Sequence, residues 1–358
     1  QPMLKYMLEV LKREQTWVML SNRHRSPVQG APWDDAVPFG RALFRAAPDR
    51  CIWGTDWPHV MQPVGSIDDA AQRQMCIRDR VSVGITNSAS DVSLFVAHKR
   101  GYFKEEGLDV SFVPFVSAAR MIAPMASGEL EVGTGALSAG LYNAVARGID
   151  VRIVADKNST PPGRGTQPLL VRKDHVDSGR YKGLKDLRGM KIAVAALGTS
   201  SMGTTSLALA QGGLTFDDVE QIALGFPEHV AALANKAVDA SFTVEPSASA
   251  AVRQGLAVRI MGDDEIVPGH QLSVTIYSGA FAKRGDQPRR FLRALLRGVR
   301  DFNDGLVNGR YAGPKGDALV AILAEYGPFK DPEIYRSFNT SYSDPDGALN
   351  MASIRQDL

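Results

Sequence analysis

The chain has 358 residues, enough for two or three compact domains, and its 44% hydrophobic and 22% charged residues are typical of a globular protein. Its 41 basic and 39 acidic side chains leave a formal net charge of +2, so no electrostatic surface for nucleic acid is indicated. Two cysteines, Cys51 and Cys76, are too few for a disulfide framework or a thiolate metal site. No apolar run approaches the roughly 18 residues that span a bilayer.

The first 74 residues predict helices that alternate with strands. A helix is expected over residues 3–14 and a short buried strand over 16–20, and the pattern repeats with a helix over 34–47 and a strand over 51–53. This alternation is the rhythm of an α/β barrel or a doubly wound sheet.

The second strand is followed at once by Asp56 and His59, within Gly-Thr-Asp-Trp-Pro-His. A carboxylate directly after a parallel strand lies at the rim where α/β barrels collect catalytic groups, so the two residues form a candidate acid/base or metal pair. The alternative, in which Asp56 caps a turn and His59 is an ordinary polar residue, stays open.

Two motifs, Ala-Pro-Trp-Asp-Asp at 31–35 and Trp-Gly-Thr-Asp-Trp-Pro-His at 53–59, resemble the C-terminal end of amidohydrolases of the 2-pyrone-4,6-dicarboxylate lactonase type. The resemblance implies that Asp56 ends the last barrel strand and takes part in hydrolysis. Because the preceding barrel strands are absent, this truncated α/β-barrel fragment has unpaired strand edges and little core. We therefore expect no hydrolase activity, and lactone hydrolysis by this segment is the alternative function.

A junction at residues 75–80 separates this fragment from the rest. Its run Met-Cys-Ile-Arg-Asp resembles a translated sequencing-library adapter, which implies a chimeric assembly of two unrelated genes rather than a natural fusion.

From residue 81 onward, strands again alternate with helices, as in a parallel sheet built from right-handed crossovers. In the first unit, strands are expected over residues 81–85, 109–115, 130–133 and 151–155, and helices over 92–100, 118–127 and 136–147. A linker at 182–188 leads to a second unit with strands over 190–194, 219–223, 240–244 and 258–261. The strand 272–277 then leads back, and the remaining C-terminal part is largely helical. Two lobes with a cleft follow, the first formed by 81–185 with 273–358 and the second by 186–272.

Ligands of such sheets bind at the carboxyl ends of strands, and the loops predicted there are small and hydroxylated. They cover residues 87–90, 117–118, 133–136 and 198–201. Helix starts offer free N–H groups and a partial positive charge, so a small anion can bind there without a cationic side chain. The alternative is that each hydroxyl only caps a helix. The candidate ligand-binding residues are Asn87, Ser88, Ser90, Ser117, Ala118, Gly135, Ala136, Thr199, Ser200, Ser201 and Glu245.

Other polar residues have two interpretations each. Glu245, after a predicted strand, accepts hydrogen bonds from a ligand amine or from the opposite lobe, or it is a solvated turn residue. Arg164 is either a carboxylate clamp or an exposed arginine, with the exposed position favoured. His98, His175, His229 and His270 are scattered, and we expect surface or helix positions rather than catalytic bases.

Four further motifs carry a second resemblance. They are Gly-Tyr-Phe-Lys-Glu-Glu-Gly-Leu-Asp-Val at 101–110, Ser-Gly-Glu-Leu-Glu-Val-Gly at 127–133, Leu-Arg-Gly-Met-Lys-Ile-Ala-Val at 187–194 and Val-Glu-Pro at 244–246. Residues 81–358 resemble the substrate-binding proteins of nitrate, sulfonate and taurine importers, a group that includes pyrimidine-precursor binders. In that family an aspartate is usual at the position of Glu131, and a tryptophan often precedes the Glu-Pro pair, where Thr243 and Val244 stand here.

The resemblance implies a two-lobed periplasmic-binding-protein fold (type II, Venus flytrap) and a receptor of an ABC importer, periplasmic or lipid-anchored. We expect it to close by a hinge on a small organic anion, such as a sulfonate or carboxylate, and to hand this ligand to a membrane permease. Neither catalysis, a cofactor nor a metal ion is expected, and the receptor is predicted to be a monomer. If it is exported, its signal stood where the upstream fragment now stands.

The chimeric origin predicts that no natural gene encodes the junction. Long reads of the source DNA are expected to break between codons 70 and 85, because the adapter-like run joins separate genes. A single uninterrupted read through these codons would refute the chimera.

Overall fold

A computed structural model describes residues 2–11, 18–20, 42–43, 45–47, 51–53, 80–195 and 200–356. In the N-terminal segment, helix α1 (Pro2–Val10) precedes strand β1 (Val18–Leu20), and β2 (Cys51–Trp53) pairs with β1 in parallel. Leu11, Leu43 and Ala47 are buried together. The predicted strand at 51–53 and the parallel pairing are confirmed, whereas most of the predicted helix over 34–47 lies outside the described residues.

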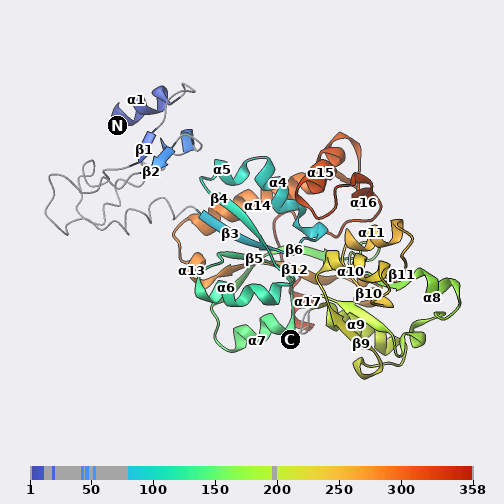
Figure 1. The fold of residues 1–358 in the computed structure, drawn as a ribbon. Helices are drawn as coiled ribbons and strands as arrows, with labels where there is room; N and C mark the ends of the chain where they lie inside the picture. Colours follow the sequence, from blue (N-terminus) through green and yellow to red (C-terminus); the bar gives the residue numbers. More distant parts are fainter. Residues whose placement is uncertain are drawn as a thin grey trace. The chain divides into compact units, whose positions relative to one another are not determined.

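The first sheet of the body has five strands in the order β4-β3-β5-β12-β6 (Figure 1). They are β3 (Arg80–Ile85), β4 (Asp109–Pro114), β5 (Val132–Ala136), β6 (Val151–Thr160) and β12 (His270–Ser278). Strand β12 is antiparallel to both of its neighbours, β5 and β6. The expectation of an all-parallel sheet is wrong here, because β6 leaves the sheet at Thr160 and β12 re-enters it at the paired residue His270, so it runs the opposite way.

The same insertion corrects a predicted loop. Residues 133–136 belong to strand β5, since Gly135 pairs with Val274 and Ala136 with Ser273 of β12. Each of these two positions therefore has a ladder partner instead of lying in an open turn.

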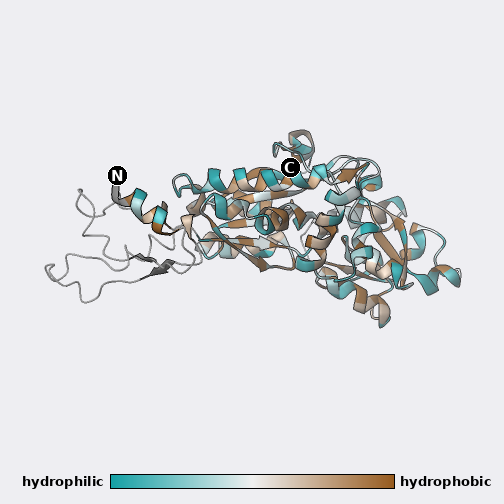
Figure 2. Cartoon of the chain, turned by 90° about the horizontal axis from the view of Figure 1, so that it is seen from above, coloured by the Kyte–Doolittle hydropathy of each residue, from teal (hydrophilic) through white to brown (hydrophobic). Residues whose placement is uncertain are grey.

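The helices of the first lobe surround its sheet, and hydrophobic residues concentrate on the strands (Figure 2). The long helix α14 (Gln287–Asp304) lies against α4 (Val92–Lys99). A Cβ atom at Gly298 would lie 2.3 Å from the Ser93 carbonyl oxygen, so only glycine permits this close crossing. The other elements of this lobe are η4 (Ala89–Asp91), α5 (Tyr102–Glu105), η5 (Ala118–Met121), α6 (Ile122–Ser127), α7 (Ala139–Ala146), α13 (Gly279–Ala282), β13 (Leu306–Val307), β14 (Arg310–Tyr311), α15 (Gly313–Tyr326) and α17 (Met351–Gln356).

The second sheet has the order β11-β7-β10-β8-β9. Its strands are β7 (Leu169–Arg172), β8 (Lys191–Val194), β9 (Glu220–Ala223), β10 (Ala240–Phe242) and β11 (Ala257–Met261). Its helical elements are α8 (Lys173–Asp177), η6 (Leu184–Leu187), α9 (Ser200–Gln211), η7 (Phe216–Asp218), α10 (Phe226–Ala234), α11 (Ser247–Arg253) and α12 (Asp263–Ile266).

This arrangement differs from the predicted lobe boundaries in two places. Strand β7 precedes the predicted boundary at 186, yet it pairs with β10 and β11 in the second sheet. Near the C-terminus, helix α16 (Pro332–Arg336) inserts Ile334 into the core of the second lobe beside Leu170 and Ala193. The sequence pattern places this segment in the first lobe, because its position after β12 carries no sign of this contact.

Two crossovers, 161–168 and 262–269, connect the sheets, and two buried carboxylates join these crossovers. Asp263 Oδ1 accepts the Gln167 N–H at 2.9 Å, and Asp264 Oδ2 accepts the Gly163 N–H at 2.7 Å. Burial, with the neighbouring Asp264 charge, raises the pKa of Asp263 to about 7, although the Gln167 N–H and Arg259 oppose this rise.

A buried ion pair lies where β6 meets the start of α4. Lys157 Nζ lies 2.6 Å from Asp91 Oδ1, and both side chains are almost completely buried. The other Asp91 oxygen accepts the Ser88 N–H at 3.0 Å. The pair therefore fixes the loop before α4 to strand β6, at the edge of the first sheet.

Replacing Asp263 by Asn should flatten the pH dependence of stability. Between about pH 4 and pH 7 the folded protein holds a proton on Asp263 that the unfolded chain releases, so stability falls as pH rises through this window. One proton corresponds to a slope of up to ~1.4 kcal/mol per pH unit. Urea unfolding from pH 4 to 8 should show a shallower decline in Asp263→Asn, since the amide oxygen can still accept the Gln167 N–H. An identical slope in both proteins would contradict the assignment.

Lys157→Met should destabilise the body by about 3–5 kcal/mol, because it leaves the Asp91 carboxylate buried without a cation. Chemical denaturation measures this loss. Lys173→Met is the matched control: Lys173 pairs with Asp177 at the surface, where such a pair contributes little. Adding Asp91→Asn to Lys157→Met should restore part of the stability. Equal effects of the two single changes would contradict a buried pair.

Candidate functional site

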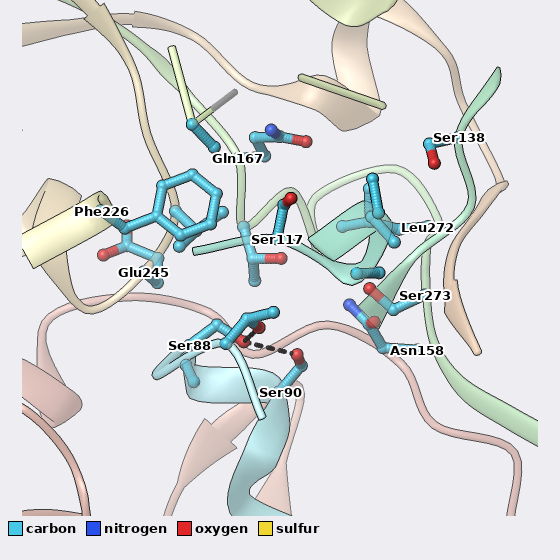
Figure 3. Close-up of a pocket in the computed structure, with 18 residues that line it drawn as sticks. Ser88, Ser90, Ser117, Ser138, Asn158, Gln167, Phe226, Glu245, Leu272 and Ser273 are labelled. Atoms are coloured by element: carbon cyan, nitrogen blue, oxygen red, sulfur yellow. Dashed lines mark hydrogen bonds between the residues drawn. The ribbon is translucent and has the colours of Figure 1, made fainter. Parts of the chain in front are cut away.

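A pocket with a cavity volume of about 50 Å³ lies between residues of the two lobes (Figure 3). One water needs ~10–15 Å³ by the same measure, so the pocket suits a small solute. The first lobe contributes Thr86, Ser88, Ala89, Ser90, Ser117, Ala118, Ala119, Ala136, Ser138, Asn158, Leu272 and Ser273. The second lobe and the first crossover contribute Thr166, Gln167, Ala195, Phe226, Val244 and Glu245.

Three hydroxyls form a short chain at the end of β3. The Ser88 hydroxyl lies 2.8 Å from that of Ser90 and 3.2 Å from that of Thr86. Asn87 makes the turn with φ of 54°, in the left-handed region that asparagine tolerates. Because hydroxyls can rotate, this chain can either donate or accept a hydrogen bond at the pocket wall.

Ser117 precedes helix η5 but does not cap it. Its side chain makes no capping hydrogen bond, and its buried Oγ has no hydrogen-bond partner among the described residues. The capping alternative is therefore wrong for Ser117, whose hydroxyl faces the pocket (Figure 3).

Two buried amide side chains also lack partners within the described ranges. Both Oδ1 and Nδ2 of Asn158 are unpaired, as is Oε1 of Gln167, and the two residues are 1% and 2% exposed. Asn158 comes from β6, whereas Gln167 comes from the first crossover. Leaving such a group buried and unpaired costs about 1–3 kcal/mol, and a ligand in the pocket would supply the missing bonds.

Glu245 lies at the junction of the lobes and is 1% exposed, so it is not a solvated turn residue. Its carboxylate accepts hydrogen bonds from Arg259 at 3.1 Å and from the Ser249 N–H at 2.9 Å. Burial raises its pKa, which these two donors oppose. Its backbone carbonyl accepts the Ala89 N–H at 2.8 Å, a direct hydrogen bond between the lobes.

The aromatic ring of Phe226, which is not among the predicted site residues, also lines the pocket. Phe226 begins helix α10, and its ring faces the cavity (Figure 3). The fully buried His229 supports this turn, since its Nε2 lies 3.0 Å from the Leu224 carbonyl and its Nδ1 lies 2.8 Å from Ser241 Oγ. Burial lowers the pKa of His229 to about 4, so the imidazole is neutral near pH 7.

Six of the predicted ligand-binding residues line the pocket: Ser88, Ser90, Ser117, Ala118, Ala136 and Glu245. Asn87 and Gly135 do not line it. Ser200 and Ser201 begin helix α9, and their side chains are outside the described structure. Thr199, Asp56 and His59 also lie outside the described residues.

The predictions missed Asn158, Gln167 and Phe226. Phe226 follows β9, so the rule that pointed to the other strand ends would have found it. Asn158 lies inside a ten-residue strand and Gln167 in a crossover, and neither position carries a local signal.

Arg164 differs from the favoured exposed position, and two histidines have the expected helical position. Arg164 is partly buried and donates to the backbone carbonyls of Thr340 and Ser341, which fixes the crossover to the C-terminal segment instead of exposing a guanidinium. His175 and His229 lie on helices, as expected, but both are buried.

In the part of the chain that the structure describes, every helix is too short or too polar to cross a bilayer. No group of three or more histidine, cysteine, aspartate or glutamate side chains within the described ranges is placed to hold a metal ion.

Solved structures share the fold of the body. A protein from Bordetella bronchiseptica RB50 aligns with a TM-score of 0.64 at 23% identity, covering 78% of this chain and 87% of that one. The alkanesulfonate-binding protein SsuA of Xanthomonas axonopodis pv. citri, bound to MOPS, aligns with a TM-score of 0.59 at 19% identity over 78% and 90%. The periplasmic nitrate-binding protein NrtA of Synechocystis PCC 6803 gives 0.61 at 15% identity over 76% and 75%. The body therefore has the two-lobed periplasmic-binding-protein fold.

Curated relatives match short stretches of the chain. The 4-sulfomuconolactone hydrolase of Rhizobium radiobacter is 42% identical over 55 residues, which are 15% of this chain and 18% of that protein. The D-galactarolactone isomerase of Agrobacterium fabrum is 28% identical over 78 residues, or 21% and 27%. The chain thus spans only about a fifth to a quarter of the length of these relatives, and the amidohydrolase profile matches residues 1–76.

The profile described as NMT1/THI5 like matches residues 89–304, more than half of the chain and nearly all of both sheets. Two unrelated profiles thus divide the sequence near the predicted junction. With its two-lobed fold and a pocket between the lobes, the chain belongs to the NMT1/THI5-like family.

Proposed function

We propose that the body is the solute-binding component of an ABC importer, which captures a small solute between its lobes and releases it to a membrane permease. The observation that carries this proposal is the pocket itself, lined from both lobes and closed by the hydrogen bond from Ala89 to Glu245. Its polar lining groups without partners suit reversible binding. Such a receptor acts outside the cytoplasm, as a monomer, with or without a lipid anchor.

The proposed mechanism is hinge closure about the crossovers 161–168 and 262–269. A ligand that contacts both lobes binds the closed form more tightly and so shifts the population toward it. Ser88 and Ser117 would contact the ligand from the first lobe, and residues 199–201 with Phe226 from the second. Small organic anions such as sulfonates and carboxylates are the ligand class that the sequence predicts, and we propose them as candidate ligands.

The described residues favour binding over catalysis. His229, the only histidine whose side chain supports a lining element in the described structure, is neutral and occupied by two hydrogen bonds. Glu245 is held by Arg259 and a backbone N–H, so it is not a free acid or base. We therefore propose that the body is not an enzyme, and that the incomplete N-terminal segment adds no hydrolase activity.

Ala89→Pro tests closure. Proline removes the N–H that meets the Glu245 carbonyl and places a ring carbon in its way, while the extended backbone of Ser88 (φ −103°, ψ 162°) suits the residue before proline. We expect at least tenfold weaker binding of any solute found in a thermal-shift screen of sulfonates, carboxylates and carboxamides, and loss of the ligand-induced decrease in radius of gyration. Ala139→Pro is the control, because it also places proline at the first position of a helix but away from this hydrogen bond.

X-ray scattering tests hinge closure, and mass spectrometry tests whether the bound solute is chemically changed. A solute that binds the wild-type chain without any decrease in radius would count against hinge closure. A solute recovered chemically changed would count against a receptor.

A further inference from the structure

The polar groups that line the pocket are uncharged, with one exception. Among the lining residues only Glu245 carries an ionisable side chain, and the neighbouring stretch 196–199, Ala-Leu-Gly-Thr, carries none. Lys157, next to the lining residue Asn158, pairs with Asp91 at 2.6 Å, and Arg259 pairs with the lining residue Glu245 at 3.1 Å. None of the described lining residues supplies a cation to an anionic ligand.

The unpaired atoms require both a donor and an acceptor from the ligand. Asn158 presents one carbonyl oxygen and one amide NH₂ in either orientation of its side chain, and all its side-chain polar atoms lack partners among the described residues. Gln167 adds an unpaired carbonyl oxygen, and Ser117 adds a hydroxyl. A carboxylate or sulfonate only accepts hydrogen bonds, so it would leave the Asn158 oxygen buried and unsatisfied in either orientation of that amide.

A planar aromatic surface complements these groups. The ring of Phe226 and the side chain of Leu272 both line the same cavity as Asn158 and Gln167 (Figure 3). Flat ligands gain both apolar contact with the ring and edge-on hydrogen bonds to the amides.

We propose that the pocket selects an uncharged, planar solute that carries an N–H donor next to a carbonyl acceptor, as in a carboxamide or a cyclic lactam, with Asn158 and Gln167 as the specificity-determining residues. This inference rests on the proposed receptor function and names the ligand class. Asn158 recognises both halves of the donor–acceptor pair, and the Gln167 oxygen accepts the second N–H where the ligand is a primary carboxamide.

Matched probes separate this class from anions. Calorimetric titration of the full chain would compare acetamide with acetate and nicotinamide with nicotinate, with 2-pyridone as the cyclic lactam and ethanesulfonate as a further anion. We expect the uncharged member of each pair to bind at least tenfold more tightly. Stronger binding of the anions would overturn the ligand class and leave the receptor function standing. Absence of binding by every uncharged probe would also overturn the class.

Two substitutions on strand β6 test whether Asn158 contacts the ligand. Asn158→Leu should weaken binding of the uncharged probes by about 10- to 100-fold, because each lost pair of hydrogen bonds leaves ligand atoms unsatisfied. Thr160→Val is the matched control: Thr160 also has a buried hydroxyl without a partner, two residues along β6, but it does not line the pocket. It should bind normally.

The melting temperature without ligand shows whether Asn158 binds the ligand or stabilises the fold. Since Asn158 makes no side-chain hydrogen bond within the described structure, Asn158→Leu should melt at or above the wild-type temperature without ligand. A lower melting temperature together with unchanged affinity would show a structural role and overturn the assignment. Phe226→Leu should weaken nicotinamide more than acetamide, because only the former has a ring to pack on Phe226.

Discussion

Lys157 and Asp91 join the edge strand β6 of the first sheet to the loop that forms the pocket wall. Asp91 accepts both the Lys157 ammonium and the Ser88 N–H, so the charge that the fold buries also orients the first hydroxyls of the site. Lys157 directly precedes Asn158, whose side chain faces the pocket. The backbone that carries the ion pair therefore also places the amide, and the sheet core and the site share one rigid support.

Several buried polar side-chain atoms of the pocket have no hydrogen-bond partner among the described residues. They belong to Ser117, Asn158 and Gln167. A ligand in the pocket can form hydrogen bonds to these atoms. The charged groups nearby are arranged differently, since Lys157, Arg259 and Glu245 are already paired. Selectivity then depends on the pattern of donors and acceptors more than on charge.

Local patterns predicted much of this molecule. Strand β2 has the predicted bounds, and the rule that ligands bind at strand ends pointed to Ser88, Ser117 and Glu245, which line the pocket. The rest depends on pairings that are distant in the chain. Residues 133–136 resemble a turn because they are small, yet β12 completes a ladder beside them. Asn158 lies within β6, and only the folded molecule shows that its amide has no partner. Packing of Ile334 into the second lobe had no sequence signal for the same reason.

Strand β12 delays completion of the first sheet during synthesis. It lies between β5 and β6, yet it leaves the ribosome only after all five strands of the second sheet have emerged. The second lobe has a continuous set of strands from β7 to β11 and can fold while translation proceeds, whereas the first sheet has a missing central strand until His270–Ser278 emerges. Such long-range pairing is slow to form. The nascent first lobe thus stays open for longer, an interval in which chaperones can bind its unpaired strands.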